Sequence, residues 1–245
     1  YDNLKKINWK KREKNLHKII KELNLNSKNW NCVIPTSGGK DSTYQAIKAK
    51  EIGLNPVLVN ASTCDLSEIG RENIENQKNI GFDVVEINTN KNVRKKLNRI
   101  GLRTLGDISW PEHVSIFTVP IRFAINYKIP LILWGENPQI QYGGPKETLK
   151  NNILDRSWME EFGGLLGFRV SDLNLFGIND KDLNIFKYPT ENELKSFPVL
   201  GIFLSHYFKW DEEDNYRIAK KYYFKNYQKK LEGCYFNYAK IDNYQ

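Results

Sequence analysis

Short, nearly continuous apolar runs alternate along this chain with longer amphipathic stretches, and this alternation is the feature that most constrains the fold. The runs expected to form strands cover residues 32–35, 56–60, 83–87, 131–134 and 199–204. Strands that are apolar along their whole length are covered on both faces, which is typical of parallel strands joined by helices. The sequence therefore predicts an α/β fold, a parallel twisted sheet with helices on both faces.

The segments outside these runs carry helix signals. Leu16, Ile19, Ile20 and Leu23 share one helical face and predict an amphipathic helix over residues 8–24. Asp211 suits the start of a closing helix. We therefore expect an N-terminal helix and linker at 1–30, a main domain at 31–210 and a C-terminal helical segment at 211–245.

Glycine, proline and capping residues predict the ends of the inner helices. Helices are expected from about Ser42 to Gly53, from Ser67 to Ile80, from Asn90 to Gly101 and over 111–127. Gly101 is expected to end the third of these, because helices commonly stop at glycine. Pro120 is expected to kink or divide the fourth, because proline lacks the N–H that an inner turn needs.

Length, charge and cysteine spacing narrow the classes of protein. The 245 residues allow one large domain, and the net charge of +8 suits a nucleic acid, an anionic nucleotide-linked substrate or an acidic partner. The lysines are spread rather than clustered, which favours a solvated basic surface, so nucleic acid is not the expected partner. No apolar run approaches the roughly 20 residues that span a bilayer, so no membrane is expected. Cys32, Cys64 and Cys234 lie far apart, which argues against disulfides and a self-contained zinc site and favours the cytoplasm.

The residues after the first apolar run form a phosphate-binding pattern, Ser37-Gly38-Gly39-Lys40-Asp41-Ser42. Adjacent glycines let backbone N–H groups approach an anion, and the helix that follows presents its positive end to it. The spacing matches neither the Walker A loop nor Gly-x-Gly-x-x-Gly. Asp41 beside Lys40 favours a magnesium-bound pyrophosphate over a bare phosphate.

Ligands of parallel sheets bind beyond the carboxyl ends of the strands. This rule predicts a crevice bounded by the loop after Thr36 and by residues 60–64, 88–90, 135–144 and 205–210.

A strand, this loop and a helix together resemble the PP-loop ATP pyrophosphatase superfamily, of the adenine nucleotide alpha hydrolase-like fold. Its members cleave ATP between the α and β phosphates and adenylate an oxygen. The resemblance implies that ATP and Mg²⁺ are bound by the loop and by backbone near Leu58, Val59 and Asn60. The residues implied are Ser37, Gly38, Gly39, Lys40, Asp41 and Ser42, with Val59 and Asn60 beside adenine and Asp41 organising Mg²⁺.

Five further segments are similar to the N-acetyl sugar amidotransferases of surface-polysaccharide and flagellin-glycan biosynthesis. They are Ile7-Asn8-Trp9-Lys10-Lys11-Arg12-Glu13, Lys96-Leu97-Asn98-Arg99-Ile100-Gly101, Trp110-Pro111-Glu112-His113, Phe117-Thr118-Val119-Pro120 and Trp134-Gly135-Glu136-Asn137-Pro138. The resemblance implies that ATP adenylates the carbonyl oxygen of an acetamido group on a sugar, one we expect to be nucleotide-linked. Ammonia then displaces AMP and leaves an acetamidino group for an O-antigen, capsule or flagellin glycan.

Candidate residues for the acceptor side follow from position and residue type. Glu136 ends a predicted strand at the crevice, and we expect it to bind Mg²⁺ or substrate. Lys209 is expected to stabilise transition-state charge, and His206 is a weaker candidate for the same role. The remaining substrate candidates are Glu112, His113, Arg122, Asn137, Gln139, Gln141 and Tyr142.

The ammonia source is expected to be a separate protein. The chain carries no Cys/His/Glu glutaminase arrangement, since its histidines are His17, His113 and His206. The resemblance implies glutaminase and ammonia-channelling subunits like those of histidine biosynthesis. It implies zinc only together with cysteines outside this segment, because members of the family carry cysteines before the position of Tyr1.

Two other functions stay open from the sequence. A PP-loop enzyme that modifies transfer RNA, by thiolation or lysidine formation, would suit the positive charge. The absence of paired cysteines argues against most of the sulfur-transfer versions. A nucleotide-binding module without turnover would also keep the loop, although Lys40, Asp41 and Ser42 are all present.

Overall fold

The computed structural model describes residues 7–25, 29–62, 65–137, 170, 173, 176–229 and 234–238. Its strands are β1 (Cys32–Pro35), β2 (Pro56–Ser62), β3 (Asp83–Asn88), β4 (Leu131–Trp134) and β5 (Leu200–Phe203). They form one sheet in the order β3-β2-β1-β4-β5, and every neighbouring pair is parallel. The predicted parallel sheet is confirmed.

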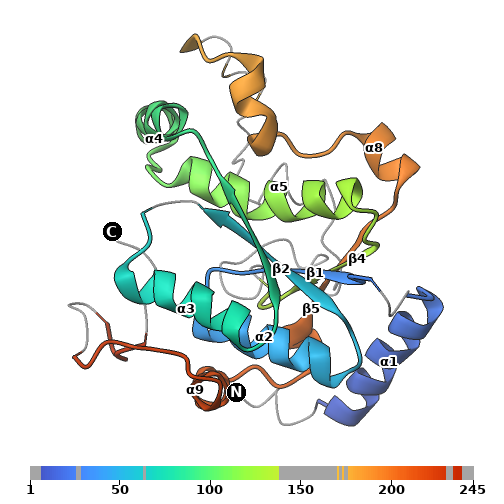
Figure 1. The fold of residues 1–245 in the computed structure, drawn as a ribbon. Helices are drawn as coiled ribbons and strands as arrows, with labels where there is room; N and C mark the ends of the chain where they lie inside the picture. The colour runs from blue at the N-terminus through green and yellow to red at the C-terminus, as the bar shows by residue number, and fades with distance from the viewer. Residues whose placement is uncertain are drawn as a thin grey trace.

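Helices cover both faces of this sheet (Figure 1). One side carries α1 (Trp9–Glu22), α2 (Lys40–Glu51), α3 (Glu68–Asn79) and α9 (Glu212–Lys221). The other side carries α4 (Lys91–Leu105), α5 (Trp110–Asn126), the 3-10 helix η4 (Asp180–Phe186) and α8 (Glu191–Ser196). A short 3-10 turn, η5 (Leu204–His206), follows β5.

Alternate side chains of the strands build two separate cores. Ile34, Leu58 and Leu133 pack toward Leu16 of α1 and the apolar face of α2. Their neighbours along the strands, such as Val33 and Val59, pack toward α5. This division follows from the pleat, which points successive side chains to opposite faces. It explains why the central strands β1 and β4 are apolar throughout.

The strand order places a reversal point beside β1. From β1 the chain moves outward through β2 to β3, then crosses back to add β4 on the other side of β1. The crossing connections leave the carboxyl ends of β1 and β4 open between them, which is where open α/β sheets bind ligands. The loop that follows β1 therefore lies at the position the fold favours for a ligand.

Two predicted helix boundaries are wrong. Helix α4 continues past Gly101 and ends at Gly106, which has the left-handed conformation at φ 72°. Gly101 instead allows a close approach, because a Cβ there would lie 2.5 Å from the carbonyl oxygen of Asp107. The predicted division at Pro120 is wrong, because α5 runs through it from Trp110 to Asn126, whereas the predicted kink stays a prediction. Its neighbours Val119 and Ile121 are buried, and this packing holds the helix across the one missing hydrogen bond.

The other predicted ends agree closely with the structure. Asn8, Ser67 and Asn90 cap α1, α3 and α4 with their side chains. Asp211 caps α9 by accepting from the N–H groups of Glu213 and Asp214. Within the described part of the chain, no helix combines the length and apolar character needed to cross a membrane. The division of the chain at 30 and 210 stays a prediction.

Candidate functional site

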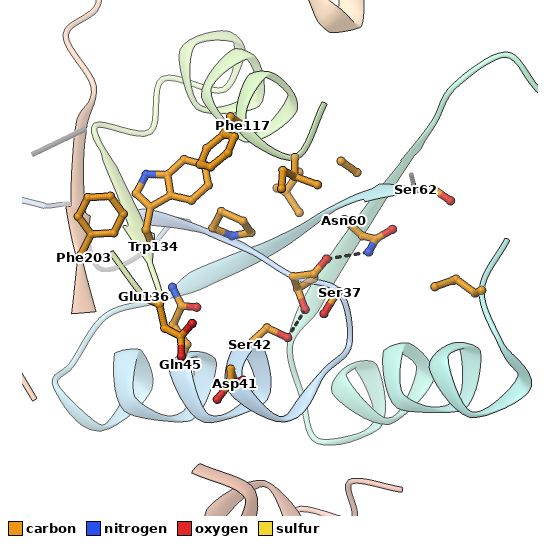
Figure 2. Close-up of a pocket in the computed structure, with 17 residues that line it drawn as sticks. Ser37, Asp41, Ser42, Gln45, Asn60, Ser62, Phe117, Trp134, Glu136 and Phe203 are labelled. Atoms are coloured by element: carbon orange, nitrogen blue, oxygen red, sulfur yellow. Dashed lines mark hydrogen bonds between the residues drawn. The ribbon is translucent and has the colours of Figure 1, made fainter. Parts of the chain in front are cut away.

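A cavity of about 400 Å³ opens at the carboxyl ends of β1, β2 and β4, beside the reversal point (Figure 2). Its lining comes from the loop after β1, the first turns of α2, the end of β2, one side of α5 and Gly135-Glu136 after β4. The predicted crevice is present, although residues 88–90 and 205–210 do not line it.

The turn between β1 and α2 depends on Gly38. Its φ is +84°, a conformation that side chains other than glycine rarely adopt. A Cβ at this position would lie 2.8 Å from Cγ1 and 3.2 Å from the backbone nitrogen of Ile74 on α3. Gly38 is therefore required both by the backbone angle and by the approach of α3.

Thr36 connects the parts of this loop. Its Oγ1 lies 3.0 Å from Oγ of Ser42 and 2.9 Å from Oε1 of Gln77, and it accepts a hydrogen bond from the N–H of Gly38 at 3.1 Å. Its carbonyl oxygen accepts from Nδ2 of Asn60 at 2.7 Å (Figure 2). Thr36 is buried, so these contacts hold the loop between β2 and α3.

The donors available to an anion differ in part from the prediction. The N–H of Gly38 is already bonded to Thr36, and the N–H of Gly39 donates to Oγ of Ser37 at 3.2 Å. Gly39 caps α2 and offers it no side-chain hydrogen bond, so the first turn of α2 keeps its positive end open. Ser37 is exposed, so its hydroxyl can turn away and leave the N–H of Gly39 free to donate to a phosphate oxygen.

Two carboxylates face the same cavity. Asp41 accepts from Nζ of Lys40 at 2.5 Å and from Nδ2 of Asn215 at 2.9 Å, and Glu136 accepts from Nε1 of Trp210 at 2.7 Å. Among the described residues that line the cavity, Asp41 and Glu136 are the charged ones. A triphosphate therefore needs a cation to enter this negative site.

The residues present fit Mg²⁺. This ion keeps several waters and takes one or two protein carboxylates together with substrate phosphates. Asp41 and Glu136 on one cavity wall supply that donor set. A protein cage of three or more His, Cys, Asp or Glu side chains is absent among the described residues, so a self-contained metal site is not found there.

The predicted cationic residues lie outside the cavity lining. Lys40 turns away to pair with Asp41, and its Nζ lies 5.6 Å from the ring centroid of Tyr238. Lys209 is 66% exposed and pairs with Asp211 and Asp214. Burial lowers the pKa of His206, and the nearby Arg12 lowers that pKa further.

The aromatic side of the cavity suits a planar base. Val59 and Asn60 line the cavity as predicted, and Phe117, Trp134 and Phe203 form an aromatic wall (Figure 2). The rings of Phe117 and Trp134 lie 5.2 Å apart. Oδ1 of Asn60 and Nε1 of Trp134 are buried and have no hydrogen-bond partner in the described structure. Buried polar atoms normally have partners, so a ligand with a donor and an acceptor would satisfy both.

Three candidates for the acceptor side are not brought to the cavity. Glu112 accepts from Asn98 at 2.8 Å, and burial raises its pKa. His113 lies 3.0 Å from Asp107 on the surface. Arg122 donates to the carbonyl of Lys187 through Nε, so its guanidinium ties α5 to the chain before α8. Each of these three side chains bonds to a neighbouring protein group instead of a ligand in the cavity.

The remaining acceptor candidates divide by location. Asn137 is buried and follows Glu136, but it does not line the cavity. Gln139, Gln141 and Tyr142 lie outside the described residues.

Several residues of this site were not predicted from the sequence. They are Thr36, Gln45, Gln77, Phe117, Trp134 and Asn215. Thr36 and Trp134 had a usable signal, since each stands at the carboxyl end of a predicted strand. Gln77 and Asn215 had none, because they reach the loop from other helices.

The sheet order and the cavity at the reversal point define a doubly wound α/β protein with a candidate ligand site after β1. No protein-family model matches the chain, and no curated protein sequence does. Among solved structures it is similar to one described as a predicted subunit of tRNA methyltransferase from Methanocaldococcus jannaschii. The identity is 14% over 77% of this chain and 75% of that chain, and the TM-score is 0.39. A likeness of this degree assigns no activity.

Proposed function

We propose that this chain binds ATP with Mg²⁺ in the cavity and cleaves it between the α and β phosphates, releasing pyrophosphate. One observation carries the proposal. Thr36 and Ser37 of the turn and the first turn of α2 line the same cavity as Asp41 and Glu136, at the reversal point of the sheet. This combination offers a triphosphate both hydrogen-bond donors and a carboxylate pair for its cation.

Each part of the site has a role in this proposal. The first turn of α2 binds the leaving pyrophosphate, and Ser42 lies beside it. Lys40 leaves Asp41 and stabilises the charge that develops on the phosphates. Asp41 and Glu136 would hold Mg²⁺, which would supply neutralising charge for the phosphate oxygens. The aromatic wall holds the base and excludes water.

For the second substrate we propose the acetamido group of a sugar, one carried by a nucleotide. Its carbonyl oxygen attacks the α-phosphorus, and the bond to pyrophosphate breaks. Ammonia then adds to the activated carbon, AMP leaves with the original oxygen, and loss of a proton leaves an acetamidino group. A separate glutaminase with an ammonia-channelling subunit would supply the ammonia in the cytoplasm. Support for this finer proposal comes from the five sequence segments that resemble the N-acetyl sugar amidotransferases.

The test uses a sugar whose acetamido oxygen carries a heavy isotope. The protein is incubated with ATP, Mg²⁺, ammonium and candidate acetamido sugars, and products are read by mass. We expect the label in AMP and an NH in place of the amide oxygen. Asp41→Asn should lose both products, whereas Lys48→Gln should keep them, because Lys48 pairs with Glu51 and does not line the cavity.

Other outcomes would contradict the proposal in distinguishable ways. AMP formed with transfer RNA but with no acetamido sugar would favour the RNA-modifying alternative. ATP binding with no AMP under any acceptor would favour a binding module without turnover. Labelled oxygen that stays in the sugar would refute adenylation of the amide.

A further inference from the structure

Helix α9 packs against α2 (Figure 1), and its Asn215 side chain contacts Asp41 at the start of α2. Trp210, just before α9, packs edge-on against Tyr44 of α2 at 5.4 Å between ring centroids. Asp211 caps α9 through two backbone N–H groups, each at 3.1 Å. The helix is therefore anchored where Asn215, 1% exposed, faces Asp41.

The two oxygens of Asp41 have different partners. Oδ2 accepts from Lys40 at 2.5 Å, and Oδ1 accepts from Nδ2 of Asn215 at 2.9 Å. Under the proposed function Lys40 moves to phosphate, which frees Oδ2 for a cation. Asn215 stays bonded to Oδ1, because its side chain is buried and its helix is capped by Asp211. One oxygen is thus available to Mg²⁺ while the other keeps the carboxylate in place.

An amide is suited to this task because it is neutral. It orients a carboxylate by a charge-assisted hydrogen bond and leaves the negative charge uncompensated. A lysine or arginine in its place would neutralise the charge that attracts Mg²⁺.

The other end of Asn215 shows that this amide costs stability. Its Oδ1 is buried and has no hydrogen-bond partner in the described structure. An unsatisfied buried acceptor is unfavourable for folding. An apolar side chain of similar shape would remove this cost, so the fold alone does not explain an asparagine here.

We infer that Asn215 is a positioning residue, which holds the carboxylate of Asp41 so that its free oxygen can bind the Mg²⁺ of Mg·ATP. The inference rests on the proposed function, since it assigns Asp41 to the metal. It adds α9, far along the chain, to the phosphate site.

The experiment measures the Mg²⁺ dependence of nucleotide binding by calorimetry. The ligand is α,β-methylene-ATP, whose α–β bond resists cleavage, so binding is separated from turnover. We expect Asn215→Ala and Asn215→Leu to weaken apparent Mg²⁺ affinity about tenfold, the effect of one charge-assisted hydrogen bond. Asn215→Leu should remain folded under the assay conditions, because removal of the unsatisfied acceptor offsets part of the loss of its hydrogen bond to Asp41.

Two controls separate positioning from a structural role. Asn226→Ala removes a comparable amide, which bonds Tyr216 and Lys220 and does not touch the loop. It should leave Mg²⁺ affinity unchanged. In an Asp41→Ala background, Asn215→Leu should have no further effect on Mg²⁺ affinity, because coupled residues are not additive.

Each result decides the inference. Unchanged Mg²⁺ affinity in Asn215→Leu would overturn it, as would an equal loss in the Asp41→Ala background. Unfolding of Asn215→Leu would also overturn it, by showing that the amide holds the fold. If the unmodified protein binds no Mg·nucleotide, the proposed function itself fails, which is a different outcome from failure of Asn215 alone.

Discussion

Replacing Gly38 by alanine should damage the phosphate loop for two separable reasons. The residue has a φ of +84°, and a left-handed conformation costs an L-residue about 1–2 kcal/mol. The new Cβ would lie 2.8 Å from Cγ1 and 3.2 Å from the backbone nitrogen of Ile74. The backbone contact cannot be relieved by a rotamer change of Ile74, so α3 or the loop must shift, at about 1–3 kcal/mol for overpacking.

The expected loss is therefore about 2–5 kcal/mol of unfolding free energy, the sum of these two ranges. A domain is typically stable by about 5–15 kcal/mol, so the variant should still fold and remain measurable. Its loop would be displaced from α3, and binding of Mg·ATP should fall with it.

Gly53 supplies a matched control. Its φ of +85° is nearly the same, yet no atom lies within 4 Å of the position of its Cβ. Gly53→Ala should therefore cost only the conformational part, about 1–2 kcal/mol. Urea unfolding of both variants and titration with Mg·α,β-methylene-ATP provide the readouts. Equal destabilisation, with nucleotide binding intact in Gly38→Ala, would refute the close-packing argument.

Three further changes test other parts of the structure. Gly101→Ala should lower the melting temperature of the protein, with a cost of about 1–3 kcal/mol, because its Cβ would lie 2.5 Å from the carbonyl oxygen of Asp107; urea unfolding that matches the unmodified protein would contradict this. Thr36→Val should lower the unfolding free energy by about 1–3 kcal/mol and weaken nucleotide binding, since it leaves the buried partners of the hydroxyl without a hydrogen bond; thermal melting and calorimetry measure the two effects. Hydrogen bonds from the backbone and side chain of Thr190 lower the pKa of Glu193, so its capping contribution is present at neutral pH and is lost as pH falls through its lowered pKa. Glu193→Gln should flatten the dependence of melting temperature on pH in the acid range, and an unchanged acid slope would count against the cap.

Much of the fold could be predicted because its signals are local. The runs at 32–35 and 131–134 are strands with those same bounds, since a short apolar run between polar turns is typical of a buried strand in an α/β chain. Capping residues such as Ser67 and Asp211 act on backbone groups two or three residues away, so they too can be recognised from sequence.

The wrong predictions concern residues whose contacts lie beyond their neighbours in the sequence. Gly101 looks like a stop, but its small size serves the approach of Asp107 inside a continuing helix. Arg122 looked able to bind an anion, but the chain before α8 takes its guanidinium. Glu136, by contrast, was predicted because it follows the end of a strand, and it lines the cavity for that reason.

By itself, the sequence determined the alternation of strands and helices, the glycine turn after the first strand and the helix that follows this turn, because each depends on neighbouring residues. Only the tertiary structure decided that β4 lies beside β1, which brings Asp41 and Glu136 to one cavity, and that α9 places Asn215 against Asp41. These arrangements of side chains depend on how whole helices and strands pack. Burial of apolar surface drives that packing but does not specify which polar side chains will meet.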